Sequence, residues 1–158
     1  MQIAELMKPV AIAVLSCALA PCAVAGSQDD SAPTSLTEEH MKIRLIVNGK
    51  TITAKLIDGP TARDFISLLP LTLTLNDLFK REKFGHLPRE ISKEGKHTHT
   101  YALGDIAYWA PGPDIAIYYR HDGERIPDPG IIVIGKIGPA VEALNVPGAV
   151  RVTMDMVK

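Results

Sequence analysis

Residues 104–137 read GDIAYWAPGPDIAIYYRHDGERIPDPGIIVIGKI, and this stretch decides the fold. Three short apolar runs, at 106–109, 115–119 and 131–134, are separated by turns rich in Pro and Gly. Short apolar runs bounded by such residues are typical of strands in a compact β-structure. The stretch also holds the only Trp and three of the four Tyr of the chain, so we expect it to build one wall of any ligand groove.

The composition of the 158-residue chain is that of one soluble globular domain with an N-terminal extension. Apolar residues make up 46% and charged residues 22%, which are ordinary values. The formal net charge is -1, so no basic field attracts nucleic acid or anionic lipid. Gly-rich phosphate loops and Ser/His/Asp triads are not recognisable. We therefore predict no nucleic-acid partner and no cofactor.

Residues 1–25 have the features of a secretory signal peptide. The apolar run at 10–20 is too short to cross a bilayer as a helix, and an A-x-A cleavage sequence follows at 23–25. We expect export to the periplasm or the extracellular space. Two alternatives stay open, an uncleaved membrane anchor and a lipid anchor on Cys17 or Cys22. Cleavage after the A-x-A sequence leaves a mature protein without Cys, which excludes disulfides and thiol chemistry.

Two segments follow the signal peptide, a polar leader and the folded domain. Residues 26–40 show no apolar period and predict a flexible leader. The domain, residues 41–158, opens with apolar/polar alternation at 43–47 and 52–56, which predicts two strands. Asn48-Gly49 between them favours a type I′ hairpin turn.

A short helix and a third strand are expected next. Thr61, three residues before Asp64, is predicted to cap the helix, and Pro70 ends it. Leu and Thr then alternate over residues 71–75 as a strand. The predicted buried stripe of the helix is Ala62, Phe65, Ile66 and Leu69.

The remaining segments are predicted from their polarity and period. Residues 76–100 indicate a long surface excursion with one short strand near 84–87, and the KREK run at 80–83 reads as a solvated loop. Residues 120–122 (RHD) read as a solvated hairpin tip. A helical turn is predicted at 138–144, and a closing strand follows at 150–156. Seven or eight short strands favour a closed barrel, which removes exposed edges.

Several short motifs resemble those of cyclophilins, and more closely the small bacterial cyclophilin-like domains. IIVIGKI at 131–137, followed by AVEAL at 140–144, is similar to their late Gly-Lys strand and helix. TARDF at 61–65 resembles their first helix. The resemblance covers residues 41–158 and implies a mainly β fold, a closed eight-stranded barrel with one short early helix and one late helical turn.

Cyclophilins proper are peptidyl-prolyl isomerases, and the resemblance implies this activity only if the catalytic motifs are present. Their catalytic strand carries Phe-His-Arg and then Phe-Met-x-Gln-Gly-Gly-Asp, and residues 72–100 reproduce neither motif. Arg81 and Arg89 are the candidates to replace the missing arginine. Whether the protein is an enzyme stays open.

The aromatic residues of the central stretch are further candidates for a groove. Alternation along a strand sends adjacent residues to opposite faces, so one member of each adjacent pair is expected inside the barrel and the other outside. The groove hypothesis requires Tyr108, Tyr118 and Arg89 to line one pocket. The full candidate set is Arg81, Arg89, Tyr108, Trp109, Tyr118 and Tyr119.

His97 and His99 lie on one face of an extended segment, and such a pair can bind a metal ion with a third ligand from His86 or His121. Without a carboxylate or Cys partner, a solvated strand with incidental His is the favoured interpretation, and we predict no metal. The sequence thus favours an exported cyclophilin-like domain that binds a small molecule or peptide. The alternative is a divergent peptidyl-prolyl isomerase, and membrane contact is expected only through the signal or a lipid anchor.

Overall fold

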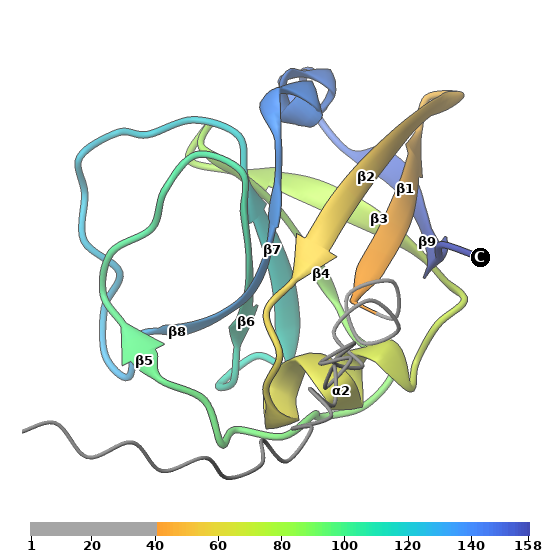
Figure 1. Cartoon of the computed structure of the whole chain (residues 1–158). Helices are drawn as coiled ribbons and strands as arrows, with labels where there is room; N and C mark the ends of the chain where they lie inside the picture. The colour runs from red at the N-terminus through yellow and green to blue at the C-terminus, as the bar shows by residue number, and fades with distance from the viewer. Residues whose placement is uncertain (1–40) are drawn as a thin grey trace, which may run out of the picture. The chain divides into compact units, whose positions relative to one another are not determined.

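The computed structural model describes residues 41–158 (Figure 1). The predicted signal peptide, leader and lipid-anchor cysteines lie outside these residues. None of the described helices is long and apolar enough to cross a membrane. The elements are β1 (Lys42–Val47), β2 (Lys50–Leu56), α2 (Pro60–Ile66), β3 (Leu71–Leu78), β4 (Glu82–His86), β5 (His97–Thr98), β6 (Asp105–Trp109), β7 (Asp114–Tyr118), β8 (Ile131–Ile137), the 3₁₀ helix η1 (Pro139–Leu144) and β9 (Val150–Met156).

Eight antiparallel strands form a closed barrel. Their order is β2-β1-β9-β3-β4-β7-β6-β8, and pairing of β8 with β2 closes the ring. The two-residue strand β5 adds to the edge of β8 beyond the end of β2. The predicted mainly β barrel with one short helix and one late helical turn is confirmed.

Gly135 lies where β8 meets β2 to close the barrel, opposite Leu56. A Cβ atom at this position would lie 2.9 Å from the carbonyl oxygen of Lys55 and 2.6 Å from the Leu56 side chain. Sterics therefore require Gly at this position of the Gly-Lys strand, because the two backbones approach too closely for any side chain.

The opening hairpin forms as predicted, but the helix begins differently. Asn48 (φ 49°) and Gly49 (φ 77°) make the tight turn between β1 and β2. The predicted cap at Thr61 is wrong, because α2 starts at Pro60 and its N-cap is Gly59, two residues earlier, without a side-chain hydrogen bond. Thr61 is instead buried within the first turn. A backbone N–H at the first helical position has no acceptor within the helix, so Pro, which lacks this N–H, is favoured there. This preference explains why the helix starts at Pro60.

Strands β6 and β7 are buried on both faces, since they separate two apolar clusters. The larger cluster fills the barrel and contains Tyr108 and Ile117. The second cluster lies on the outer face and takes Ala107, Ala116 and Tyr118, covered by Tyr101 and Ile126 from the loops. The long loops beside β6 and β8 in Figure 1 are those that carry these covering residues.

The prediction of a solvated KREK loop is wrong. Arg81, Glu82 and Lys83 are only 6%, 4% and 0% exposed. Strand β3 continues to Leu78 and β4 begins at Glu82, so two paired strands occupy the first part of the predicted excursion. These three side chains are buried because the barrel and its loops close around the β3–β4 hairpin. The charged run itself gives no sign of this tertiary contact.

Lys83 is buried because its ammonium group has three acceptors. Nζ donates to Asp77 Oδ2 at 2.7 Å and to the carbonyl oxygens of Val146 and Gly148 at 2.6 Å each. Tyr119 donates to the same Asp77 oxygen at 2.7 Å. Desolvation raises the pKa of Asp77, but the hydrogen bonds from Lys83 and Tyr119 outweigh it and hold that pKa below 3.8.

Replacing Lys83 by Met is expected to destabilise the fold by about 3 kcal/mol, because Asp77 and two carbonyl groups then lose their buried donor. Chemical unfolding followed by circular dichroism measures this change. Lys80→Met on the same hairpin is the matched control, since Lys80 is exposed and a surface change stays within about 0.5 kcal/mol. Equal stability of the two variants would contradict a structural role for the buried ammonium group.

Candidate functional site

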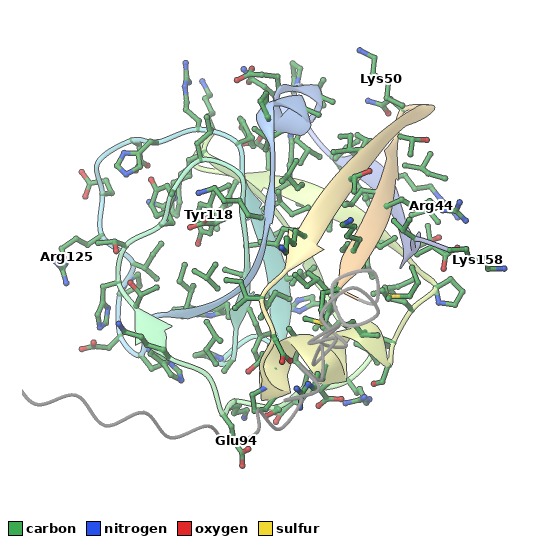
Figure 2. All side chains as sticks on the ribbon, in the orientation of Figure 1. Arg44, Lys50, Glu94, Tyr118, Arg125 and Lys158 are labelled. Atoms are coloured by element: carbon green, nitrogen blue, oxygen red, sulfur yellow. The ribbon has the colours of Figure 1, made fainter. Side chains whose placement is uncertain are left out.

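A groove lies on the outer face of the barrel, between strands β4, β6 and β7 and the loop that follows β7. Its volume is about 250 Å³. Figure 2 shows Tyr118 on the side of the strands that faces the long loops. The groove is lined by Leu78, Phe79, Arg81, Glu82, Phe84, Trp109, Asp114, Ala116, Tyr118, Ile126, Pro127 and Ile131.

Strand alternation explains why the floor of the groove is largely apolar. Phe84 pairs with Ala116 across β4 and β7, and both point away from the barrel interior. Trp109, at the end of β6, packs against the same outer cluster. Ile126 and Ile131, from the covering loop and the start of β8, belong to this cluster too. The small Ala116 side chain leaves the space between its larger neighbours.

A polar network borders one end of the groove. The Arg81 guanidinium donates to Asp122 Oδ2 at 3.2 Å, and the Tyr101 hydroxyl donates to the other Asp122 oxygen. Residues 120–122 are exposed, as predicted, but they do not form the tip of a hairpin. Strand β7 pairs with β4 and β6, not with β8, so this segment crosses the outer face instead of turning a hairpin. Asp122 ties it to the barrel.

Aromatic rings surround the Arg81 guanidinium. Its central carbon lies over the Phe79 ring at 5.0 Å and over the Tyr101 ring at 5.5 Å. Tyr101 stacks on Tyr118 at 4.2 Å between centroids and on His121 at 4.9 Å. These contacts hold the guanidinium in place, because cations are attracted to aromatic faces.

Glu82 is one of two buried acids that line the groove, the other being Asp114. Burial raises the pKa of Glu82 above 4.5, and a hydrogen bond from Tyr118 and the positive charge of Arg81 only partly offset this rise. Arg81 Nη2 lies 3.7 Å from Glu82 Oε1. Burial, followed by the neighbouring charge of Glu82, also raises the pKa of the Tyr118 hydroxyl. Folded Glu82 therefore holds its proton more tightly than an exposed glutamate does.

Two buried polar atoms at this end of the groove have no hydrogen-bonding partner. They are Arg81 Nε, a donor, and Glu82 Oε2, an acceptor while the carboxyl is ionised. A buried polar group without a partner costs about 1–3 kcal/mol, so a ligand group that reaches either atom on binding would offset that cost.

Three of the six predicted groove residues line this groove: Arg81, Trp109 and Tyr118. Tyr108 lies inside the barrel with no exposed surface, and its hydroxyl accepts from the Ile91 amide at 3.3 Å. Tyr119 is buried in the interior cluster and bonded to Asp77. Alternation along β6 and at the end of β7 explains why each adjacent aromatic pair is split between the two faces.

Arg89 lies outside the groove, so Tyr108, Tyr118 and Arg89 do not line one pocket and that form of the groove hypothesis is wrong. The Arg89 guanidinium donates to Asp64 Oδ1 at 2.6 Å and Ser67 Oγ at 2.7 Å. It therefore holds the loop after β4 against the end of α2. The sequence around Arg89 does not distinguish it from Arg81, but their hydrogen-bonding partners in the fold do.

The histidines of the predicted metal pair hold the loop that covers the outer face. Nδ1 of His97 lies 3.0 Å from the carbonyl oxygen of Pro129, and Nδ1 of His99 lies 2.9 Å from that of Ile126. Within residues 41–158, no group of three or more His, Cys, Asp or Glu side chains is placed to hold a metal ion.

Sequence reasoning missed Glu82, Asp122 and Phe79. Glu82 carried a usable signal, since Glu82, Lys83 and Phe84 alternate across β4 once that strand is recognised. Asp122 and Phe79 carried none, because a loop that crosses a barrel and a turn without Gly or Asn have no local signature.

Replacing Glu82 by Gln is expected to raise stability increasingly as the pH rises. A raised pKa means that folded Glu82 retains its proton more tightly than the unfolded chain does, so the wild-type loses stability as the pH rises above 4.5 through the folded pKa. Glu82→Gln lacks this loss. Denaturant unfolding between pH 4 and 8 measures the difference. Glu124→Gln, in an exposed loop position, is the control, and a pH-independent effect of Glu82→Gln would contradict the raised pKa.

Comparisons with known proteins agree with the barrel. The profile of the cyclophilin-like family matches residues 45–155, which is more than half of the chain. No curated protein matches the sequence.

One similar solved structure is that of a hypothetical protein from Archaeoglobus fulgidus, determined in solution. The TM-score is 0.60 at 23% identity, and the alignment covers 76% of this chain and 97% of that protein. This likeness concerns the fold alone. The match over residues 45–155, together with the closed eight-stranded barrel, shows that the chain belongs to the cyclophilin-like family.

Proposed function

We propose that the outer groove binds an apolar group carried on an amide, as in a short peptide or a small amide-containing molecule. The observation that carries this proposal is the presence of an unpaired donor, Arg81 Nε, and an unpaired acceptor, Glu82 Oε2, beside an apolar floor. An amide has one carbonyl acceptor and one N–H donor, so it complements both atoms. Neither atom is matched by a purely apolar ligand.

The size of the groove limits the ligand. Pockets for drug-sized molecules measure about 300–1,000 Å³, and this groove, at about 250 Å³, is smaller. One apolar side chain with its adjacent amide is the appropriate size. The proposed setting is outside the cytoplasm, which the N-terminal residues predict.

Filling the groove is expected to abolish binding. Ala116→Leu places a larger side chain on the floor, and we expect the affinity for N-acetyl-L-phenylalaninamide to fall at least about tenfold. Trp109 is the only Trp of the chain and lines the groove, so its fluorescence reports occupancy directly.

Ala149→Leu, at an exposed loop position, is the matched control for this variant, and circular dichroism checks that both remain folded. Two further probes test the ligand chemistry. N-acetylglycinamide lacks the side chain and 3-phenylpropanol lacks the amide, so both are expected to bind more weakly. Equal binding of N-acetyl-L-phenylalaninamide to wild-type and Ala116→Leu would overturn the proposal.

A divergent peptidyl-prolyl isomerase is the second candidate, and the position of Arg81 in the groove favours it over one that uses Arg89. Such an enzyme must lower the barrier of about 18–20 kcal/mol to peptide-bond rotation, and a guanidinium donor close to the amide is the required group. If the protein is an isomerase, Arg81→Lys slows isomerisation of an X-Pro peptide and Arg120→Lys, an exposed neighbour, does not. A wild-type rate equal to the uncatalysed rate excludes this candidate.

A further inference from the structure

Two tight turns of the domain share one unusual backbone conformation but have different sequences. In the turn between β1 and β2, Asn48 and Gly49 have φ values of 49° and 77°. In the turn between β3 and β4, Phe79 and Lys80 both have φ of 54°, and the Arg81 amide donates to the Leu78 carbonyl oxygen at 3.2 Å. Positive φ at both central residues is the property of a type I′ turn, which strongly prefers Asn-Gly.

The Phe79–Lys80 turn is therefore strained, whereas the Asn48–Gly49 turn is not. Left-handed backbone brings the Cβ of an L-residue too close to the following carbonyl oxygen, and Asn and Gly tolerate it far better than Phe and Lys. The strain amounts to roughly a tenfold loss in the folded-to-unfolded ratio for each such residue.

The surrounding structure holds the turn in place. Asp77 Oδ1 accepts from the Lys80 amide at 3.0 Å, and the other Asp77 oxygen is fixed by Lys83 and Tyr119. Strain that a structure maintains in this way is concentrated at functional sites.

Apart from its contact with the Arg81 guanidinium, the Phe79 side chain packs on little of the fold. It is 70% exposed, more than any other large apolar side chain among the described residues, and it belongs to neither apolar cluster. Its ring lies at the wall of the groove, beside the Arg81 guanidinium. Folding alone would favour Asn at this position, for both backbone conformation and solubility.

We propose that Phe79 is a specificity-determining residue, held in a strained turn so that its ring contacts the apolar group of the bound ligand. This inference rests on the proposed function of the groove. Lys80 does not line the groove, so it contributes strain but no ligand contact. Stability and binding are thus separable at two adjacent positions.

The test uses variants of the full chain and the probe N-acetyl-L-phenylalaninamide, with Trp109 fluorescence for binding and chemical denaturation for stability. Phe79→Asn is expected to raise the folded-to-unfolded ratio about tenfold and to weaken probe binding about tenfold. Lys80→Gly is expected to stabilise the fold while leaving the affinity unchanged. Phe79→Ala, which keeps a Cβ in the strained position, is expected to weaken binding without a comparable gain in stability.

Gly49→Lys is the converse control, since it introduces the same strain at the other turn, where a side chain meets nothing within 4 Å. It is expected to destabilise the fold and leave binding unchanged. If neither Phe79→Asn nor Lys80→Gly gains stability, the inference that the turn is strained is wrong. If the probe affinity of Phe79→Asn is unchanged, the inference that Phe79 contacts the ligand is wrong. If Ala116→Leu also leaves probe binding unchanged, the groove function itself fails; if Ala116→Leu abolishes binding and Phe79→Asn does not, only the role of Phe79 fails.

Discussion

Closure of the barrel by strand β8 is the constraint on which the rest of the structure depends. One edge of β8 pairs with β6, while the other edge pairs first with β5 and then with β2. The second pairing brings two backbones together at Gly135, where no side chain fits. A closed ring gives each strand a definite inside and outside, so alternation then decides which side chain enters the core and which enters the groove. The groove is a consequence of closure, since its floor consists of outward-facing residues of β4, β6 and β7.

The groove also depends on the loop that covers the outer face, and the same residues serve both structures. Arg81 and Tyr101 hold Asp122, while His97 and His99 bond to carbonyl groups further along the loop. A loss of binding on changing Arg81 can therefore arise from a displaced loop as well as from a lost ligand contact. Ala116 separates these effects more clearly, because its side chain forms no hydrogen bond. Phe79 is largely exposed, but its ring also contacts the Arg81 guanidinium.

The sequence predicted those parts of the fold in which local chemistry and tertiary structure agree. Asn48-Gly49 forms its turn, the Leu/Thr alternation forms β3, and the adjacent aromatic pairs divide between the faces as a two-residue period requires. The burial of Arg81, Glu82 and Lys83 was missed, because it depends on carbonyl groups of Val146 and Gly148 and on Asp122, which are distant in the sequence. Arg81 and Arg89 were equivalent candidates for the same reason. Only the fold shows that one faces the groove and the other pairs with Asp64.

The two type I′ turns provide the sharpest distinction between residues kept for folding and residues kept for another purpose. Both turns connect antiparallel strands of one barrel, so the backbone requirement is the same and folding alone would favour the same residues in each. One turn meets that requirement with Asn and Gly, and the other departs from it with Phe and Lys beside the groove. Natural sequences are locally consistent with their folds except where function opposes it. The departure at Phe79 therefore points to the same face of the barrel as the unpaired atoms of Arg81 and Glu82, although it is independent of them, because backbone strain and buried polarity have different physical origins.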